Sequence, residues 1–211
     1  PVLQDIFPID TGDQIWGSIA SSDIDNDGYI DIVVTSKSNH LYVIDKNGIK
    51  LDYEAESQLI ATPSLGNIDS DDDLEIIIGG YSSNSQNLLA LNIDGSNAFI
   101  NNIDIIEKNK SGFALADFNN NNKDDIVFGT DSSNLYLIYD DGSIAEGFPF
   151  ASDGKFRIAP IIVDNFGYKI IIIPSENNHI YGILNDGSLK FDIAFDNEIT
   201  TSVSALDISN N

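Results

Sequence analysis

One motif recurs along the chain at a nearly constant interval, and this repetition limits the possible folds more than any other feature. A segment rich in aspartate and asparagine, followed by an aliphatic run, starts at Asp23, Asn67, Asp117 and Asp164, and a further copy starts at Asp207. Successive starts are 44, 50, 47 and 43 residues apart. A period of about 46 residues is typical of repeat proteins in which each unit is one supersecondary element.

A second marker has the same period. Four alternating apolar segments, LYVIDKNG, LLALNIDG, LYLIYDDG and IYGILNDG, each end in Asn-Gly or Asp-Gly. These dipeptides accept the positive φ angles of a tight type I′ hairpin turn. Each unit therefore resolves into four short strands, which in the first unit we place at 15–22, 30–36, 40–46 and 49–55. No segment has a sustained apolar period of about 3.6 residues, so very little helix is expected.

The second strand of each unit is apolar on both faces, as in DIVV, EIIIGG, DIVFG and KIIIIP, and such a strand must be covered on both sides. Four-stranded sheets stacked face to face around an axis meet this requirement. The predicted fold is therefore an all-β propeller over residues 1–211, with full blades at 10–56, 57–104, 105–151 and 152–196. A parallel β-helix is less favoured, because its shorter coils would not carry a hairpin in every repeat.

The two ends of the chain are expected to belong to incomplete blades. Residues 1–9 have the register of a last strand, and residues 197–211 that of a first strand. We therefore expect an open arc that belongs to a larger ring of about six to eight blades. The chain also begins at Pro1 without a methionine, as expected of a processed product or a fragment.

The charge balance narrows the choice of partners. The chain has 34 acidic and 10 basic residues, a formal net charge of −24, which argues against nucleic acid and anionic membrane surfaces. It has no cysteine, which excludes disulfides, thiol catalysis and zinc–cysteine sites. No apolar run reaches the ~18 residues of a membrane span, so no membrane insertion is expected.

The first repeated segment, DIDNDGYID, has the spacing of a calcium-binding loop. Side-chain oxygens fall at positions 1, 3, 5 and 9, and Gly28 at position 6 permits a sharp turn around one point. An EF-hand loop starts in the same way, but Val34 stands where that loop has its bidentate glutamate. An all-oxygen, highly charged and flexible cage suits Ca²⁺ better than Mg²⁺. The predicted ligands are Asp23, Asp25, Asp27, the carbonyl of Tyr29, and Asp31.

The second and third copies keep this spacing with less charge. At position 6 we expect Asp72 and Asn122 to take the left-handed conformation that glycine takes in the first copy. The predicted ligands of the second loop are Asn67, Asp69, Asp71, the carbonyl of Asp73, and Glu75. Those of the third loop are Asp117, Asn119, Asn121, the carbonyl of Lys123, and Asp125.

The formal charge of the ligands predicts an order of occupancy. It falls from −4 to −3 to −2 across the three loops, so Ca²⁺ should fill 23–31 first, then 67–75, then 117–125. The fourth copy is shorter and has Lys169 in place of the closing carboxylate, so no metal is expected there. A plain polar turn between strands is the alternative reading of each loop. It accounts for one loop but not for the same spacing in copy after copy.

The units resemble FG-GAP/VCBS repeats, the blades of integrin-α-like propellers and of many bacterial surface proteins. The resemblance covers nearly the whole chain and rests on the Asp-x-Asp-x-Asp-Gly-x-x-Asp run, the following aliphatic strand, Leu-Tyr-Val and the Asn-Gly turn. It implies a propeller fold with structural calcium between the first and second strands of a blade. It also implies that ligands bind at other loops, which differ from member to member.

Three classes of function fit these features. The favoured one is a non-catalytic extracellular module, secreted or attached to the cell surface. It would serve adhesion, scaffolding, or the binding of an unknown extracellular protein or glycan, together with the remainder of the propeller. The alternative is the propeller part of an extracellular enzyme, such as a polysaccharide lyase or a quinone-dependent dehydrogenase, although no irregular insertion between blades offers an active site. The third is a purely structural spacer.

Two histidines, His40 and His179, stand at the same position of two units. A residue that recurs at one blade position is more often a packing or turn element than a catalyst. We therefore assign no catalytic residue.

Overall fold

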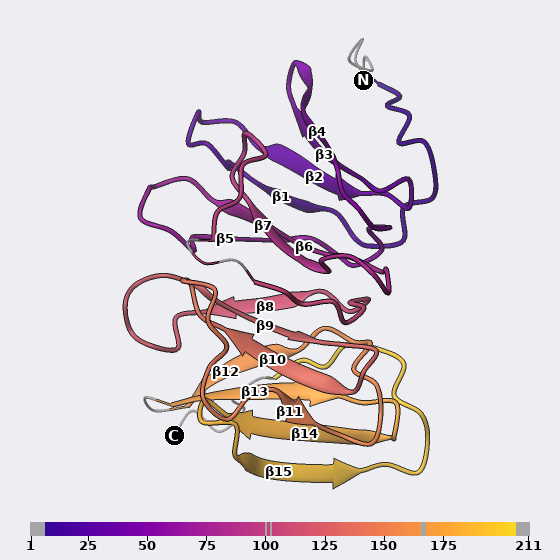
Figure 1. Cartoon of the computed structure of the whole chain (residues 1–211), viewed down its shortest axis with the longest axis vertical. Helices are drawn as coiled ribbons and strands as arrows, with labels where there is room; N and C mark the ends of the chain where they lie inside the picture. Colours follow the sequence, from indigo (N-terminus) through magenta and orange to yellow (C-terminus); the bar gives the residue numbers. More distant parts are fainter. Residues whose placement is uncertain (1–6, 100, 102, 166–167, 206–211) are drawn as a thin grey trace.

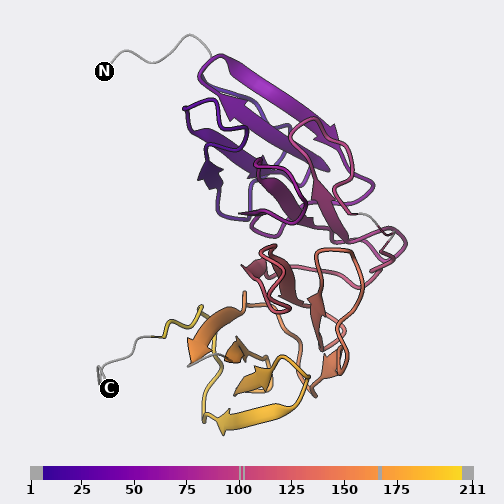
Figure 2. The same ribbon diagram turned by 90° about the vertical axis from the view of Figure 1, so that its left-hand side faces the viewer.

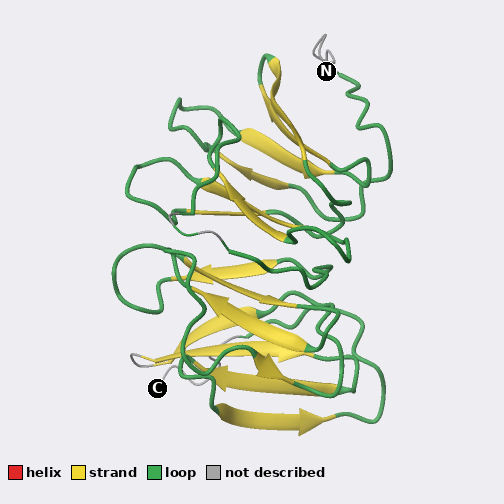
Figure 3. Cartoon of the chain, viewed as in Figure 1, coloured by secondary structure: helices red, strands yellow, loops and turns green. Residues whose placement is uncertain are grey.

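The computed structural model describes residues 7–99, 101, 103–165 and 168–205, and this part of the chain forms strands and turns without any helix (Figure 3). The first sheet joins β1 (Ala20–Ser22), β2 (Asp31–Thr35), β3 (His40–Asp45) and β4 (Gly48–Glu54). The second joins β5 (Ser64–Gly66), β6 (Glu75–Gly79) and β7 (Leu88–Leu91). The third joins β8 (Phe113–Ala116), β9 (Asp125–Gly129), β10 (Asn134–Ile138) and β11 (Phe150–Ala151). The fourth joins β12 (Ile161–Asn165), β13 (Tyr168–Pro174), β14 (His179–Leu184) and β15 (Leu189–Ala194).

Each sheet is an antiparallel meander, and the four sheets follow one another in chain order (Figure 1). The first strands of neighbouring sheets contact each other, β1 with β5, β5 with β8, and β8 with β12. Residues just before these strands, Ser18, Thr62, Gly112 and Ala159, line one common cavity. The sheets are therefore blades arranged around an axis, and their first strands lie innermost (Figure 2). The predicted propeller fold is confirmed.

An apolar layer fills the space between each pair of neighbouring sheets. Ile76 and Ile78 of β6 pack toward the first sheet, whereas Ile77 between them packs toward the third. All residues of β6 and β9 are buried. This arrangement explains why the second strand of a blade is apolar on both faces, and burial of each such side chain contributes about 1.5–3 kcal/mol.

The hairpins between the third and fourth strands differ from the predicted type I′ turn. The glycines Gly48, Gly95, Gly142 and Gly187 have positive φ, but the Asn or Asp before each of them does not. A type I′ turn requires positive φ at both residues, so that prediction is wrong. In three of the hairpins the Asp side chain accepts a hydrogen bond from the backbone N–H of the serine two residues later, which holds the Asp in an ordinary turn conformation. The glycine alone then takes the left-handed position.

The second blade forms fewer strands than predicted, and the incomplete blades expected at the two chain ends stay a prediction. Among the described residues of the second blade, an isolated bridge between Leu91 and Asn97 stands in place of the fourth strand. Residues 7–9 and 197–205 have no strand partner and are irregular, since a strand exists only where another backbone pairs with it. Residues 1–6 of the predicted last strand and 206–211 of the predicted first strand lie outside the described residues.

Both histidines contact neighbouring side chains of their own blade. His40 Nδ1 lies 2.5 Å from Asp52 Oδ1, and the imidazole stacks on the ring of Tyr42 with centroids 5.7 Å apart. His179 repeats this arrangement with Asp192 at 2.5 Å. The repeated contact supports the packing role expected from the sequence.

Among the described residues, no helix is long and apolar enough to cross a membrane.

Candidate metal centre

The three predicted calcium loops lie at one end of the stacked sheets. They connect β1 to β2, β5 to β6 and β8 to β9. Neighbouring loops are joined through their backbones, because Leu74 N donates to Ile24 O at 2.9 Å and Asp124 N donates to Asn67 O at 2.7 Å. The loops therefore form a continuous row across three blades.

The predicted closing ligand of each loop, at position 9, is buried. Asp31, Glu75 and Asp125 are 1%, 1% and 0% exposed. Each begins the second strand of its blade and accepts a hydrogen bond from the backbone N–H at position 2 of its own loop, at 3.1, 2.7 and 2.7 Å. A carboxylate buried in this way is costly unless a cation or further donors satisfy its other oxygen.

A second hydrogen bond is common to all three loops. The side chain at position 5 accepts a bond from the backbone N–H at position 7, at 2.9, 3.0 and 2.9 Å. The acceptor and donor pairs are Asp27 and Tyr29, Asp71 and Asp73, and Asn121 and Lys123. This bond fixes the bend of each loop. Ligation by the carbonyl groups at position 7 stays a prediction.

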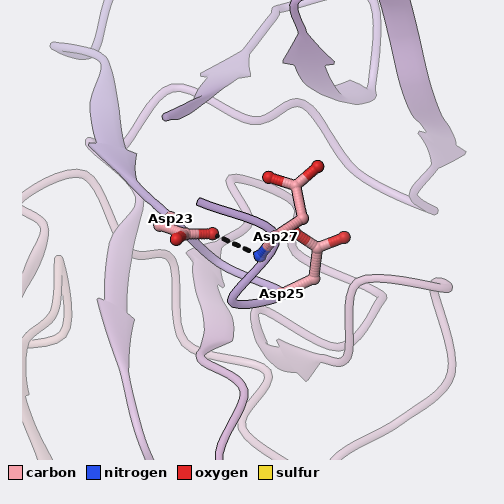
Figure 4. Close-up of side chains that lie close together, drawn as sticks. All are labelled: Asp23, Asp25 and Asp27. Atoms are coloured by element: carbon pink, nitrogen blue, oxygen red, sulfur yellow. Dashed lines mark hydrogen bonds between the residues drawn. The ribbon is translucent and has the colours of Figure 1, made fainter. Parts of the chain in front are cut away.

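In the first loop three carboxylates gather. One oxygen from each of Asp23, Asp25 and Asp27 lies within 4.8 Å of the others (Figure 4). Asp23 also closes the loop, because its two oxygens accept bonds from the backbone N–H groups of Asp27 and Gly28, both at 2.9 Å. Gly28 has φ of 87°, so the left-handed turn at position 6 is confirmed in this loop.

A lysine that sequence reasoning did not assign to the site lies beside these carboxylates. Lys50 comes from β4, and its Nζ is 2.5 Å from Asp25 Oδ2 and 3.6 Å from Asp31 Oδ1. The hydrogen bond from Lys50 lowers the pKa of Asp25. The other oxygen of Asp25, Oδ1, is buried without a hydrogen-bond partner. A cation from β4 therefore lies beside the first loop, and one oxygen of a predicted ligand there has no hydrogen-bond partner.

In the second loop three acidic side chains lie close together, and no basic side chain of the described chain pairs with them. Asp69, Asp71 and Glu75 each place one oxygen within 4.8 Å of the others. No ion pair of the described chain reaches any of the three. Burial raises the pKa of Glu75 to about 7, and the charges of Asp69 and Asp71 add to this effect. Asn67 does not join the acidic group but donates from Nδ2 to Asp71 O at 2.9 Å.

The backbone of the second loop differs from the other two. Positions 4 and 6 have positive φ in the first loop and in the third, where Asn122 has φ of 68° as expected. Asp72 does not have positive φ, so the left-handed conformation predicted for it is wrong. The second loop has neither glycine nor asparagine at these positions. Its aspartates hold ordinary turns by accepting bonds from the N–H two residues later, as Asp69 does from Asp71 at 2.9 Å.

In the third loop an aspartate from another element accepts hydrogen bonds from the amide side chains of two predicted ligands. Asp140, in the hairpin after β10, accepts bonds from Asn121 Nδ2 at 2.7 Å and Asn119 Nδ2 at 3.3 Å. Lys123 Nζ lies 3.4 Å from its other oxygen. The two asparagines therefore turn their amide nitrogens toward Asp140. Asp117 repeats the loop-closing role of Asp23 by accepting the N–H groups of positions 5 and 6, at 3.1 and 2.8 Å. No acidic group of three forms here among the described residues.

The fourth copy is paired strand where the first three copies are loops. Asp164 lies opposite Lys169, and Asn165 opposite Tyr168, in the antiparallel ladder of β12 and β13. The prediction that no metal binds here is untested. The fifth copy, with Asp207, lies outside the described residues.

The donor sets of the first two loops fit a calcium ion. The first offers gathered carboxylates from Asp23, Asp25 and Asp27, with the unsatisfied Asp25 Oδ1 among them, and Asp31 is linked to Asp25 through Lys50. The second offers Asp69, Asp71 and Glu75, whose charges have no counter-ion in the described chain. A hard cation that takes six to eight flexible oxygen ligands would satisfy these groups. Amide nitrogens that face Asp140 make the third loop a poorer fit.

The structure is similar to known β-propellers. It matches BBS1N, crystallised in complex with ARL6DN, with a TM-score of 0.65 and 10% identity over 88% of this chain and 56% of that one. It matches the PilY1 C-terminal domain of Pseudomonas aeruginosa with a TM-score of 0.58 and 16% identity over 82% of this chain and 51% of that one. BamB from Moraxella catarrhalis gives a TM-score of 0.53 and 16% identity, with 85% of this chain and 53% of that one covered.

The chain thus spans 51–56% of the length of these solved chains, and at such identities the likeness shows the fold alone. No protein-family model matches the chain, and no curated protein sequence matches it. The resemblance to FG-GAP/VCBS repeats therefore rests on the sequence motifs. What the comparisons show is that the chain is a β-propeller.

Proposed function

We propose that the chain is a non-catalytic binding or scaffolding module whose blade loops are stabilised by Ca²⁺. The observation that carries this proposal is the acidic group of the second loop. Three carboxylate oxygens lie within 4.8 Å of one another, one of them from Glu75, which is 1% exposed. Without a cation this arrangement is self-repulsive, and an all-oxygen set of this kind is suited to Ca²⁺.

The position of the loops gives the metal a structural role. Each loop carries a backbone hydrogen bond to its neighbour, from Leu74 to Ile24 and from Asp124 to Asn67. A metal that fixes the shape of one loop therefore also fixes its junction with the next blade. Extracellular calcium-binding modules typically have a Kd of about 10⁻⁴–10⁻³ M, and we propose that these loops belong to that class in a secreted or cell-surface protein.

Partner binding is proposed at the opposite end of the blades. A cavity of about 450 Å³ lies there, and the hydroxyl-bearing residues Ser18, Thr62, Ser111 and Thr201 are among those that line it. Arg157 borders it, held by Asp131 through two hydrogen bonds of 2.7 and 2.9 Å. A polar cavity of this size suits a protein side chain or a sugar of an extracellular partner. The complex of BBS1N with ARL6DN supports protein binding by a propeller in general terms.

Thermal unfolding of the whole chain tests the metal dependence. After chelator treatment, calcium at about 100 times Kd should add about 2.7 kcal/mol for a single filled site. The same concentration of magnesium should add less, because Mg²⁺ prefers a stricter octahedral site and keeps more of its water. Unfolding curves that coincide with calcium and with chelator would contradict the proposal. Turnover of a polysaccharide, or of a substrate with added quinone, would show that the chain is part of an enzyme instead.

A further inference from the structure

We infer that Lys50 acts as a built-in counter-ion of the first loop and competes there with the metal, so that the second loop is the tighter calcium site. This inference rests on the proposed function of the loops. The observation that supports it is the position of Lys50 Nζ, which lies 2.5 Å from Asp25 Oδ2 and 3.6 Å from Asp31 Oδ1. These carboxylates are the predicted ligands at positions 3 and 9.

The ammonium group and a calcium ion cannot share these oxygens. Lys50 and Asp25 each have side chains that are 24% exposed, and Asp31 is 1% exposed, so water screens their charges only in part. A calcium ion bound at about 2.3–2.6 Å from the same carboxylates would lie close to Nζ, and their like charges would repel strongly. A metal that binds through Asp25 Oδ2 or Asp31 Oδ1 therefore requires that Lys50 leaves that oxygen, and a metal that binds through Asp25 Oδ1 would still be repelled by the nearby ammonium group.

The second loop has no equivalent of Lys50. The residue two positions after the hairpin glycine is Lys50 in the first unit, but Asn97 in the second and Ile144 in the third. Asn97 donates from Nδ2 to Phe99 O at 2.8 Å and so lies in another interaction. The second loop therefore has no basic side chain of the described chain that a metal would have to displace. This reverses the order of occupancy expected from ligand charge alone.

Lys46 provides a matched control. It belongs to the same hairpin and lies 3.7 Å from Asp27 Oδ2, but its side chain is 39% exposed and sits over the ring of Tyr29. Its charge is therefore better screened, and it does not contact the buried carboxylate Asp31. Loss of Lys46 removes the same formal charge from the same hairpin without removing the proposed competitor.

The experiment is calorimetric titration of calcium into the whole chelator-treated chain. Asp71→Ala disables the second loop, and Lys50→Met or Lys46→Met is added to that background, with circular dichroism to confirm that each variant is folded. We expect Asp71→Ala to remove the tightest site of the unaltered chain. Lys50→Met should then tighten binding at the first loop by at least about tenfold, against less than about threefold for Lys46→Met.

The outcomes separate the two claims. If Lys50→Met and Lys46→Met change the affinity of the first loop equally, or if Asp71→Ala leaves the tightest site in place, the inference about Lys50 is wrong and calcium binding itself stands. If the unaltered chain and the Lys50→Met variant both bind no calcium, the proposed function is wrong, and the inference fails with it.

Discussion

The first and second loops have the same spacing, the same place in their blades and the same buried closing carboxylate, yet different groups surround that carboxylate. In the first loop Lys50 reaches Asp25 and Asp31 from a neighbouring strand. In the second loop Asp69, Asp71 and Glu75 face one another without a cation from the described chain. The comparison shows that the formal charge of a loop's own residues differs from the net charge around its predicted metal site. A residue from the adjoining hairpin can neutralise it.

The largest expected effects come from the two closing carboxylates, and they should have opposite signs. In chelator at about pH 8, Asp31→Asn should cost about 1–2 kcal/mol, because it leaves the partly buried Lys50 with one partner fewer. Glu75→Gln should instead stabilise the metal-free chain by a similar amount, because it removes a buried charge whose pKa burial has raised to about 7. Chemical denaturation in chelator measures both.

The matched design of these two variants isolates charge from hydrogen bonding. The amide oxygen of each replacement can still accept the backbone N–H at position 2, a bond of 3.1 Å at Asp31 and 2.7 Å at Glu75. In calcium the sign at the second loop should reverse, since Glu75→Gln also removes a metal ligand. Equal destabilisation by both variants in chelator would contradict the difference between the loops.

A smaller effect on stability is expected from a substitution at the end of the blades away from the loops. Calcium should not change the size of this effect. Burial alone would raise the pKa of Asp131, but hydrogen bonds from Arg157 and Tyr81 hold it below the ordinary value of 3.8. A lowered pKa contributes stability above 3.8 that is lost as the pH falls through the folded-state value. Asp131→Asn should therefore cost about 1 kcal/mol at neutral pH and almost nothing in strong acid.

The control for this prediction is Asp153→Asn, at an exposed aspartate of the same end of the blades. It should leave stability nearly unchanged at every pH. The cost of Asp131→Asn should also be the same in calcium and in chelator. A cost that appears only in calcium would mean that the two ends of the blades are not independent.

The blades could be predicted from sequence because their determinants are local and repeat. Apolar alternation, a turn glycine and an Asp-x-Asp spacing recur in each unit, and the stacked sheets follow from a second strand that is apolar on both faces. The φ angle of Asp72 was predicted wrongly, because the preference of one residue was carried over from the glycine of the first loop. The actual turn depends on side chains two residues away.

The partners Lys50 and Asp140 could not be predicted from the loops alone, since they come from the adjoining hairpins. One signal was present in the sequence. Lysine stands two residues after the hairpin glycine only in the first unit, where asparagine, isoleucine and leucine stand in the others. A repeat position that gains a charge in one copy indicates an interaction specific to that copy. Which oxygens the charge reaches is visible only once the strands are paired.

The most direct test of calcium binding is a crystal structure of the chain grown with calcium, with data collected at a wavelength where calcium scatters anomalously. We expect an anomalous peak bound by Asp69, Asp71 and Glu75, with oxygens at about 2.3–2.6 Å. At limiting calcium this peak should be stronger than any peak in the first loop, which lies beside Lys50 of β4. Saturating calcium without a peak at the second loop, or with a peak only between Asp164 and Lys169, would contradict the account.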